Sequence, residues 1–182
     1  MAVLPIVLAP DLILKKRCEP VAAVDDAVRQ LLDDMLETMY AAPGIGLAAP
    51  QVGVDARVLV MDVAKDGAPP QPMKLVNPEI VARSDELSVY NEGCLSLPEH
   101  YADIERPARV TVRYLDETGA EQLLEADGLL ATCVQHEIDH IDGVLFVDHL
   151  SKLKRDLVLR KMRKYKKEQS REGAEGDAAD AA

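Results

Sequence analysis

Residues 135–146 have the sequence QHEIDHIDGVLF, which places His136 and His140 four positions apart with Glu137 directly after the first histidine. On an α-helix of about 3.6 residues per turn, the two imidazoles lie on one face and can bind a single metal ion. Glu137 is rotated by roughly 100° from His136, so it can reach water beside the metal but is not a third ligand on that face. The pattern therefore predicts a catalytic metal site on a buried helix.

A third ligand has to come from elsewhere in the chain. In metzincin proteases the motif continues to a third histidine, but the corresponding residue here is Phe146, which cannot bind a metal. His149 and His100 are available, although neither has a spacing that indicates a ligand. Cys94 is the stronger candidate because it lies beside Gly93, after a predicted strand. A thiolate with two imidazoles leaves one coordination position open for water, as catalytic metal sites need.

The remaining sequence predicts an α+β fold in which antiparallel strands surround the motif helix. Apolar residues recur at helical spacing in residues 25–42 and 129–142, and a last helix is predicted for residues 151–169. We expect one domain over residues 1–169, followed by an acidic tail without regular structure over residues 170–182. The predicted strands are residues 57–63, 74–81, 86–90, 109–115 and 121–126.

The charge of the chain is unevenly distributed. Its net charge of −11 over 182 residues argues against general nucleic-acid binding, because a phosphate polymer would be repelled. Residues 152–167 differ from the rest, with nine Lys or Arg and one acid, a net charge of +8. This segment predicts either a docking surface for an anionic partner or a solvated helix face.

Three cysteines and the N-terminal segment bear on localisation. Cys18, Cys94 and Cys133 are too few and too scattered for a disulfide framework, which fits a reducing cytoplasm. The N-terminal segment has no basic start and is interrupted by Pro5, so no signal peptide is predicted. No run reaches the roughly 18 apolar residues that span a bilayer. We expect a cytoplasmic protein, monomeric by default, that binds neither DNA nor membranes.

Residues 44–53, GIGLAAPQVG, contain glycines in a pattern similar to a dinucleotide-binding fingerprint. That fingerprint follows a strand and opens a helix, whereas this segment follows a predicted helix and soon meets Pro50. We therefore expect a flexible backbone that approaches a substrate main chain closely.

Three segments together resemble one known family, the peptide deformylases. GIGLAAPQVG (44–53), EGCLSLP (92–98) and QHEIDH (135–140) resemble the three motifs of that family, in the same order and at similar spacing. The resemblance covers nearly the whole chain and is greatest to the bacterial type. It implies a hydrolase that removes the formyl group from the N-terminal formyl-methionine of newly synthesised proteins and releases formate.

The resemblance also implies roles for individual residues. Cys94, His136 and His140 would bind one divalent metal ion, Fe²⁺ in the cell, with Zn²⁺, Ni²⁺ or Co²⁺ as substitutes in purified protein. Metal-bound hydroxide would attack the formyl carbon, with Glu137 as general base and acid. The other implied assignments are Gln51 and the Leu95 backbone amide at the oxyanion, Gly46 in the substrate groove, and Ile45, Tyr90, Glu92, Leu129 and Cys133 around the methionine side chain. For Ile45 and Leu129, core packing is an equal alternative.

Tyr101 and the C-terminal helix are two further points of comparison with the family, and two other classes of protein are alternatives to it. Tyr101 stands where some deformylases carry an arginine near the substrate backbone. Family members dock on the ribosome through their C-terminal helix, for which residues 151–167 are the candidate here. A zinc endopeptidase with another third ligand, or a metal-binding protein without activity, would use the same helix motif. A closed site with four protein ligands would favour the latter, and Glu137 beside an open position argues against it.

Overall fold

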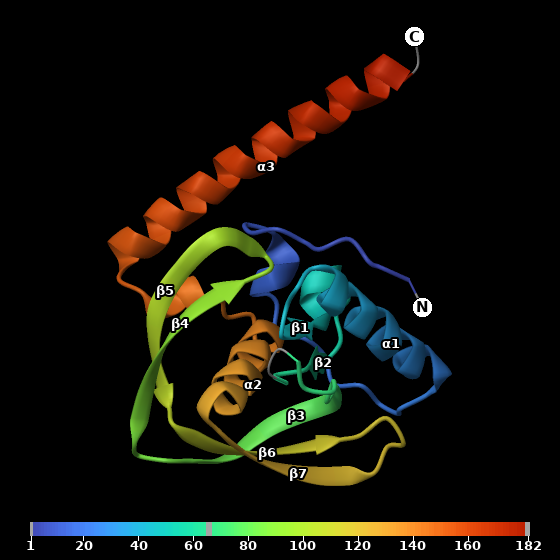
Figure 1. Cartoon of the computed structure of the whole chain (residues 1–182), viewed down its shortest axis with the longest axis vertical. Coiled ribbons are helices and arrows are strands. Elements are labelled where there is room, and N and C mark those ends of the chain that lie inside the picture. Colours follow the sequence, from blue (N-terminus) through green and yellow to red (C-terminus); the bar gives the residue numbers. More distant parts are fainter. Residues whose placement is uncertain (1, 65–66, 181–182) are drawn as a thin grey trace.

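A computed structural model describes residues 2–64 and 67–180, with side chains up to residue 170, and has an α+β fold (Figure 1). The elements, including three short 3₁₀ helices (η), are η1 (Leu12–Lys15), α1 (Asp26–Ala41), β1 (Gly46–Ala48), η2 (Ala49–Val52), β2 (Val58–Met61), β3 (Met73–Arg83), β4 (Leu87–Cys94), β5 (Leu97–Pro107), β6 (Arg109–Leu115), β7 (Glu121–Asp127), α2 (Gly128–Ile141), η3 (Phe146–His149) and α3 (Lys152–Asp180).

The strands form two antiparallel sheets around helix α2. The larger sheet has the order β1-β2-β3-β6-β7, and β4 and β5 pair separately as a long ribbon. In Figure 1, α2 lies between this ribbon on one side and α1 with β1 and β2 on the other. Nearly every side chain of α2 from Ala131 to Ile141 is buried, because the helix contacts strands of both sheets. This burial removes the candidate metal-binding face from bulk water.

Helix α1 follows from its sequence pattern. The Asp25 side chain accepts a hydrogen bond of 2.9 Å from the backbone N–H of Val28, which caps the first turn. The apolar face packs on β1 and β2, and the helix ends just before the Pro43–Gly44 pair. Its buried residues are Leu32, Met35, Thr38 and Met39.

Strand β3 continues through Pro78, which lies inside the predicted strand 74–81. The pairing of β3 with β6 shifts register between Val76 and Glu79, and this bulge accommodates a residue that has no N–H to donate. Asn77 adopts a left-handed backbone (φ 50°), which asparagine tolerates better than most residues. The Asn77 side chain accepts a hydrogen bond from the N–H of Val21 and donates one to its C=O, each at 2.8 Å, and so fixes the bulge.

Strand β5, which contains His100, lies where no strand was predicted. Residues 97–107 form one strand, with side chains that alternate between the buried and exposed faces along most of its length. The sequence did not predict this strand, because one inward position holds the charged Arg106 and prolines stand near both ends. By contrast, β6 spans the predicted residues 109–115, and β7 extends the predicted strand by one residue.

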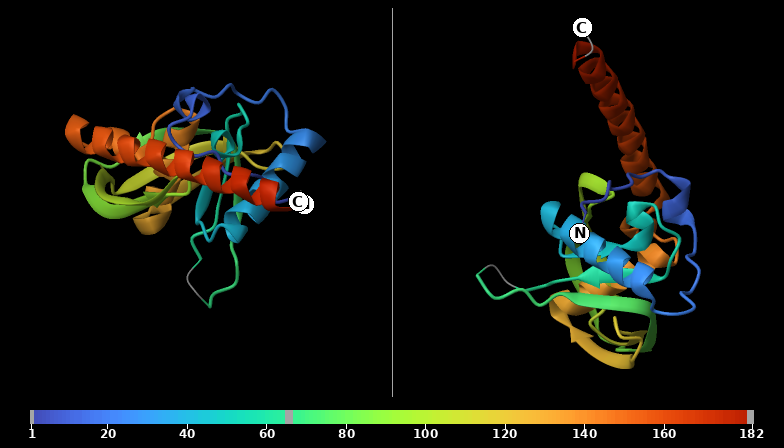
Figure 2. Two further views of the ribbon diagram at one scale, coloured as in Figure 1. Left: turned by 90° about the horizontal axis from the view of Figure 1, so that it is seen from above. Right: turned by 90° about the vertical axis from the view of Figure 1, so that its right-hand side faces the viewer.

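Helix α3 is longer than expected and extends away from the body of the protein (Figure 2). Its first half packs through the fully buried Met162 onto the N-terminal segment, and the Lys166 ammonium donates to the carbonyl of Leu8 at 3.1 Å. Helix α3 continues through Asp180, over a segment for which a tail without regular structure was expected; its alanines and the absence of proline permit helix. Residues 181 and 182 lie outside the described part. No helix in the described part of the chain has both the length and the apolar character needed to cross a membrane.

Candidate metal centre and active site

Cys94, at the end of β4, meets His136 and His140 of α2. The Cys94 Sγ lies 3.2 Å from His140 Nε2, and the Nε2 atoms of the two histidines lie 3.2 Å apart. The three candidate ligand atoms all fall within 4.8 Å of one another, and no other such group occurs among the side chains that the structure describes, up to residue 170. The predicted third ligand, some forty residues before the helix motif, is therefore in reach of the same ion.

The donor set fits a divalent transition metal. The His136 Nδ1–H donates to a Glu92 carboxylate oxygen at 2.9 Å, which leaves the Nε2 lone pair directed at the other two donors. His140 is 1% exposed, and its Nδ1 is buried without a hydrogen-bond partner in the described part of the chain, so its Nε2 also faces the group. One sulfur and two imidazole nitrogens suit zinc, iron, cobalt or nickel.

The other two histidines are engaged elsewhere. His149 Nε2 lies 2.8 Å from an Asp139 oxygen, and His100 Nδ1–H donates to the carbonyl of Pro98 at 2.8 Å. Neither belongs to the converging group, so both alternatives for the third ligand are disfavoured.

A buried ion-pair network supports His136. The Arg106 guanidinium contacts both oxygens of Glu92, at 2.6 and 3.0 Å, and reaches Asp139 at 2.7 Å. Burial opposes ionisation of Glu92, but the hydrogen bonds from His136 and Arg106 outweigh it and lower the pKa of this carboxyl. Glu92 was predicted beside the methionine pocket. It does line the cavity, yet its carboxylate is committed to His136 and Arg106. Arg106 was not predicted, because its partners Glu92 and Asp139 come from two other segments of the chain, β4 and α2.

Glu137 is 4% exposed and one of its carboxylate oxygens has no hydrogen-bond partner among the described residues. Burial raises the pKa of Glu137 to about 7; the His136 charge lowers it, and the Glu92 charge raises it. A Cβ atom on Gly46 would lie 2.4 Å from a Glu137 oxygen and 2.9 Å from the Cys133 sulfur. Glycine is therefore required at this position, because any side chain would displace the carboxylate.

Gln51 presents its amide to the same group. The side-chain carbonyl of Gln51 accepts a hydrogen bond of 2.8 Å from the backbone N–H of Ala48. The side-chain NH₂ lies 3.3 Å from the Ser96 hydroxyl and 3.5 Å from the Cys94 sulfur. The side chain is buried, so this orientation is fixed. Leu95 follows Cys94 directly and lines the same space as Gln51. The contribution of Ser96 was not predicted, since nothing in the sequence distinguishes this serine.

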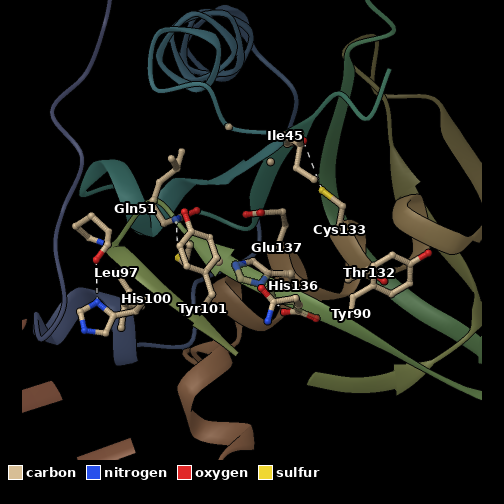
Figure 3. A pocket seen from close by; sticks show the side chains of 18 of the residues that line it. Ile45, Gln51, Tyr90, Leu97, His100, Tyr101, Thr132, Cys133, His136 and Glu137 are labelled. Carbon is tan, nitrogen blue, oxygen red and sulfur yellow. Dashed lines mark hydrogen bonds and ion pairs between the residues drawn. The ribbon is translucent and has the colours of Figure 1, made fainter. Parts of the chain in front are cut away.

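A cavity of about 440 Å³ joins these residues (Figure 3). Ile45 and Leu129 are 44% and 42% exposed at its rim, which disfavours the core-packing alternative for both. Burial raises the pKa of Cys133 well above its ordinary value, so this residue contributes a neutral thiol to the wall. All the predicted site residues except His140, which lies deeper, line the cavity: Ile45, Gly46, Gln51, Tyr90, Glu92, Cys94, Leu95, Leu129, Cys133, His136 and Glu137.

Comparisons with known proteins agree with this geometry. The family model for polypeptide deformylase matches residues 3–156. The chain belongs to the polypeptide deformylase family. The peptide deformylase of Rhizobium meliloti (strain 1021) is 57% identical over 164 residues, which are 90% of this chain and 94% of that protein. Among solved structures, the deformylase from Ehrlichia chaffeensis has a TM-score of 0.88 at 44% identity and covers 92% of this chain and 99% of its own. That from Legionella pneumophila has a TM-score of 0.85 at 45% identity and covers 93% and 99%.

The family assignment confirms the resemblance and the predicted α+β fold. Deformylases are metal-dependent hydrolases that remove N-formyl groups from nascent peptides, so the chain is an enzyme of this class. The group formed by Cys94, His136 and His140 agrees with metal dependence. The endopeptidase and the inactive metal-binding protein are no longer supported.

Proposed function

We propose that this chain acts in the cytoplasm on the N-terminal formyl-methionine of newly synthesised proteins, cleaving the formyl amide to release formate and a free methionine amine. The observation that carries the proposal is the convergence of one thiol and two imidazoles at a cavity that also holds the buried carboxylate of Glu137, one oxygen of which has no hydrogen-bond partner among the described residues. That combination suits hydrolysis of an amide at a metal.

Cys94, His136 and His140 would hold one divalent ion, and similarity to the bacterial deformylases favours Fe²⁺ in the cell. Zinc, nickel and cobalt suit the same donors and are expected to substitute in purified protein. When bound, the metal supplies a Lewis acid, which lowers the pKa of water and polarises a carbonyl oxygen. Glu92 and Arg106 support this by holding His136 in the orientation and tautomer that a ligand needs.

Glu137 is the proposed general base and acid. It takes a proton from the water whose oxygen attacks the formyl carbon, and it delivers that proton to the amine nitrogen as the C–N bond breaks. Its carboxylate has an oxygen free of any hydrogen bond among the described residues, so it is available to water. Such proton transfer contributes typically 10²- to 10⁴-fold to the rate.

Gln51 and the backbone N–H of Leu95 are the proposed donors to the oxygen that gains negative charge. The Gln51 NH₂ is held within 3.5 Å of the Cys94 sulfur, beside the place where the formyl group would react. One donor of this kind typically contributes roughly 3 kcal/mol in the transition state. The donors act without reorganisation because the amide of Gln51 is already fixed by Ala48.

The substrate main chain is proposed to lie along residues 44–46. Strand β1 is at the edge of the five-stranded sheet, so its outer side can accept a peptide as an added strand. Gly46 permits the close approach. The methionine side chain then enters between Ile45, Leu129, Cys133 and Tyr90, a neutral pocket that suits a thioether.

The basic segment of α3 is the proposed ribosome contact. Most of the nine Lys and Arg side chains between residues 152 and 167 are exposed, while the opposite side of the helix packs on the N-terminal segment. Exposed positive charge suits ribosomal RNA or an anionic ribosomal surface. A monomer is sufficient for this arrangement.

The reaction is tested with N-formyl-Met-Ala-Ser and its N-acetyl counterpart, using protein purified without oxygen and assayed for metal. We expect formate from the formyl peptide and at least 100-fold slower release of acetate, because the additional methyl group must fit a tight site. Equal hydrolysis of both peptides, or of neither by metal-replete protein, would contradict the proposal.

A further inference from the structure

Tyr101 stands at the mouth of the cavity, and the proposed reaction gives it no role. It is 71% exposed, yet it lines the same space as Glu137 and His136 (Figure 3). Because the ring is mostly exposed, packing in the core does not explain an aromatic residue at this position.

A bulge in β5 sets the position of Tyr101. Gly93 of β4 pairs with Tyr101, but the next residue, Cys94, pairs with Leu97, so residues 98–100 of β5 have no partner opposite them. Within this bulge Glu99 has a φ of 62°, which redirects the strand. Bulges of this kind re-aim side chains near active sites.

Gly93 then fixes the ring. A Cβ atom on Gly93 would lie 2.6 and 2.8 Å from two carbons of the Tyr101 ring, so the ring rests directly against the backbone of Gly93. Most of the Tyr101 side chain is nevertheless exposed, and in the described residues no hydrogen bond engages its hydroxyl group. A tyrosine held in this way offers a contact surface at low cost in conformational entropy.

The arrangement of the cavity tells which part of a peptide reaches this ring. In Figure 3, Cys133, Thr132 and Tyr90 lie on one side of Glu137, and Tyr101 lies on the other. The methionine side chain is proposed to enter the first side, so this step rests on the proposed function. Successive side chains of an extended chain point in opposite directions, and the side chain after the methionine therefore points towards Tyr101.

We infer that Tyr101 is a specificity-determining residue, whose exposed ring contacts the side chain directly after the formyl-methionine and favours aromatic and large apolar residues there. Aromatic side chains pack on one another with a preference beyond simple area burial. The contact is made in the substrate complex and the transition state alike, so it acts mainly on KM.

The test compares kcat/KM for N-formyl-Met-Phe-Ser and N-formyl-Met-Ala-Ser. We expect wild-type enzyme to prefer the phenylalanine peptide by about fivefold, the order of magnitude of a favourable aromatic pair. Tyr101→Ala should remove the preference through KM, with kcat for the alanine peptide retained, and Tyr101→Phe should keep it. Leu123→Ala is the matched control, because Leu123 is 66% exposed on β7 and does not line the cavity.

Three results would overturn the inference: no preference in the wild type, an unchanged preference in Tyr101→Ala, or an equal loss of activity with both peptides in that variant. Wild-type, metal-replete enzyme that releases formate from neither peptide would instead overturn the proposed function, and this inference with it. The two failures are therefore distinguishable by the wild-type activity alone.

Discussion

At the scale of single residues, Gly46 and Glu137 depend on each other. The carboxylate of Glu137 is buried under the backbone of residue 46, and a Cβ atom there would lie only 2.4 Å from its oxygen. A glycine within a strand is usually unfavourable, and Gly46 is the first residue of β1. Here it keeps the proposed general base in place, and the cost in strand stability is local because β1 has only three residues.

Gly46→Ala is therefore expected to reduce kcat/KM for formyl peptides by about 100-fold or more, as a misplacement of this size does at catalytic groups. Metal content should stay at the wild-type level, because none of the three ligands is moved. Gly67→Ala is the control: its added Cβ meets nothing within 4 Å, although a φ of 83° makes it strained. Wild-type activity in Gly46→Ala would contradict this role.

The sequence predicted the three candidate metal ligands more completely than the residues that hold them in place. His136 and His140 followed from their spacing on a helix. Cys94 was a candidate from its place beside Gly93 after a predicted strand, and the similarity to the family's motifs added support for it. Arg106 could not be predicted in the same way. Its function depends on Glu92, Asp139 and His136 meeting at one point, which only the pairing of β4 with β5 and the docking of α2 bring about.

At the scale of elements, the ribbon of β4 and β5 supplies Cys94 to α2 and is tied to that helix by the Arg106 network. Arg106→Leu is expected to lower the free energy of unfolding by about 3–5 kcal/mol, because it leaves the buried Glu92 without its partner. Arg109→Leu is the matched control: its pair with Glu86 is exposed and should contribute at most about 1 kcal/mol. Urea unfolding at equal metal loading measures both, and equal losses would contradict the account.

The hairpin between β6 and β7 is expected to make stability depend on pH. Hydrogen bonds from Thr118 and Gln122 lower the pKa of Asp116 to about 2, below its value in an unfolded chain. The contribution of Asp116 is therefore complete above about pH 4 and is lost as the pH falls towards 2. Asp116→Ala should lower Tm at neutral pH, and the difference from wild type should shrink across that window.

Asp85→Ala provides the comparison, since Asp85 is exposed and makes no ion pair or hydrogen bond among the described residues. It should change Tm little at any pH. A difference between wild type and Asp116→Ala that stayed constant down to pH 2 would show that the carboxylate charge is not what holds the turn.

Element prediction succeeded where periodicity was simple and failed where it was interrupted. Strands β6 and β7 and helix α1 were predicted to within about a residue or two, because their apolar spacing is regular. Strand β5 was missed because its inward positions include the charged Arg106 and because prolines stand near both of its ends. The rim of the cavity that β5 forms is therefore the part of the site that sequence patterns predict least well.

At the scale of the whole molecule, α3 combines a packed half with a basic, projecting surface (Figure 2). Deleting residues 151–182 would remove the buried Met162 and damage the core, so charge reversal is the sharper test of docking. Lys161, Lys164 and Lys167 replaced together by Glu should weaken ribosome binding at least tenfold at physiological salt, with formyl-peptide hydrolysis unchanged. Truncation after Ser170 is the control and should retain binding. Unchanged affinity in the charge-reversed variant would contradict docking through α3.

The central claim is that Glu137 performs proton transfer beside a metal held by Cys94, His136 and His140. The most direct measurement is formate release from N-formyl-Met-Ala-Ser by iron-loaded wild type and Glu137→Gln, each with its metal content assayed, and with Glu105→Gln as an exposed control on β5. We predict rapid release by the wild type and the control, and a loss of 10²- to 10⁴-fold in Glu137→Gln at full metal content. Glu137→Gln that keeps wild-type activity, or metal-replete wild type that releases no formate, would contradict the account.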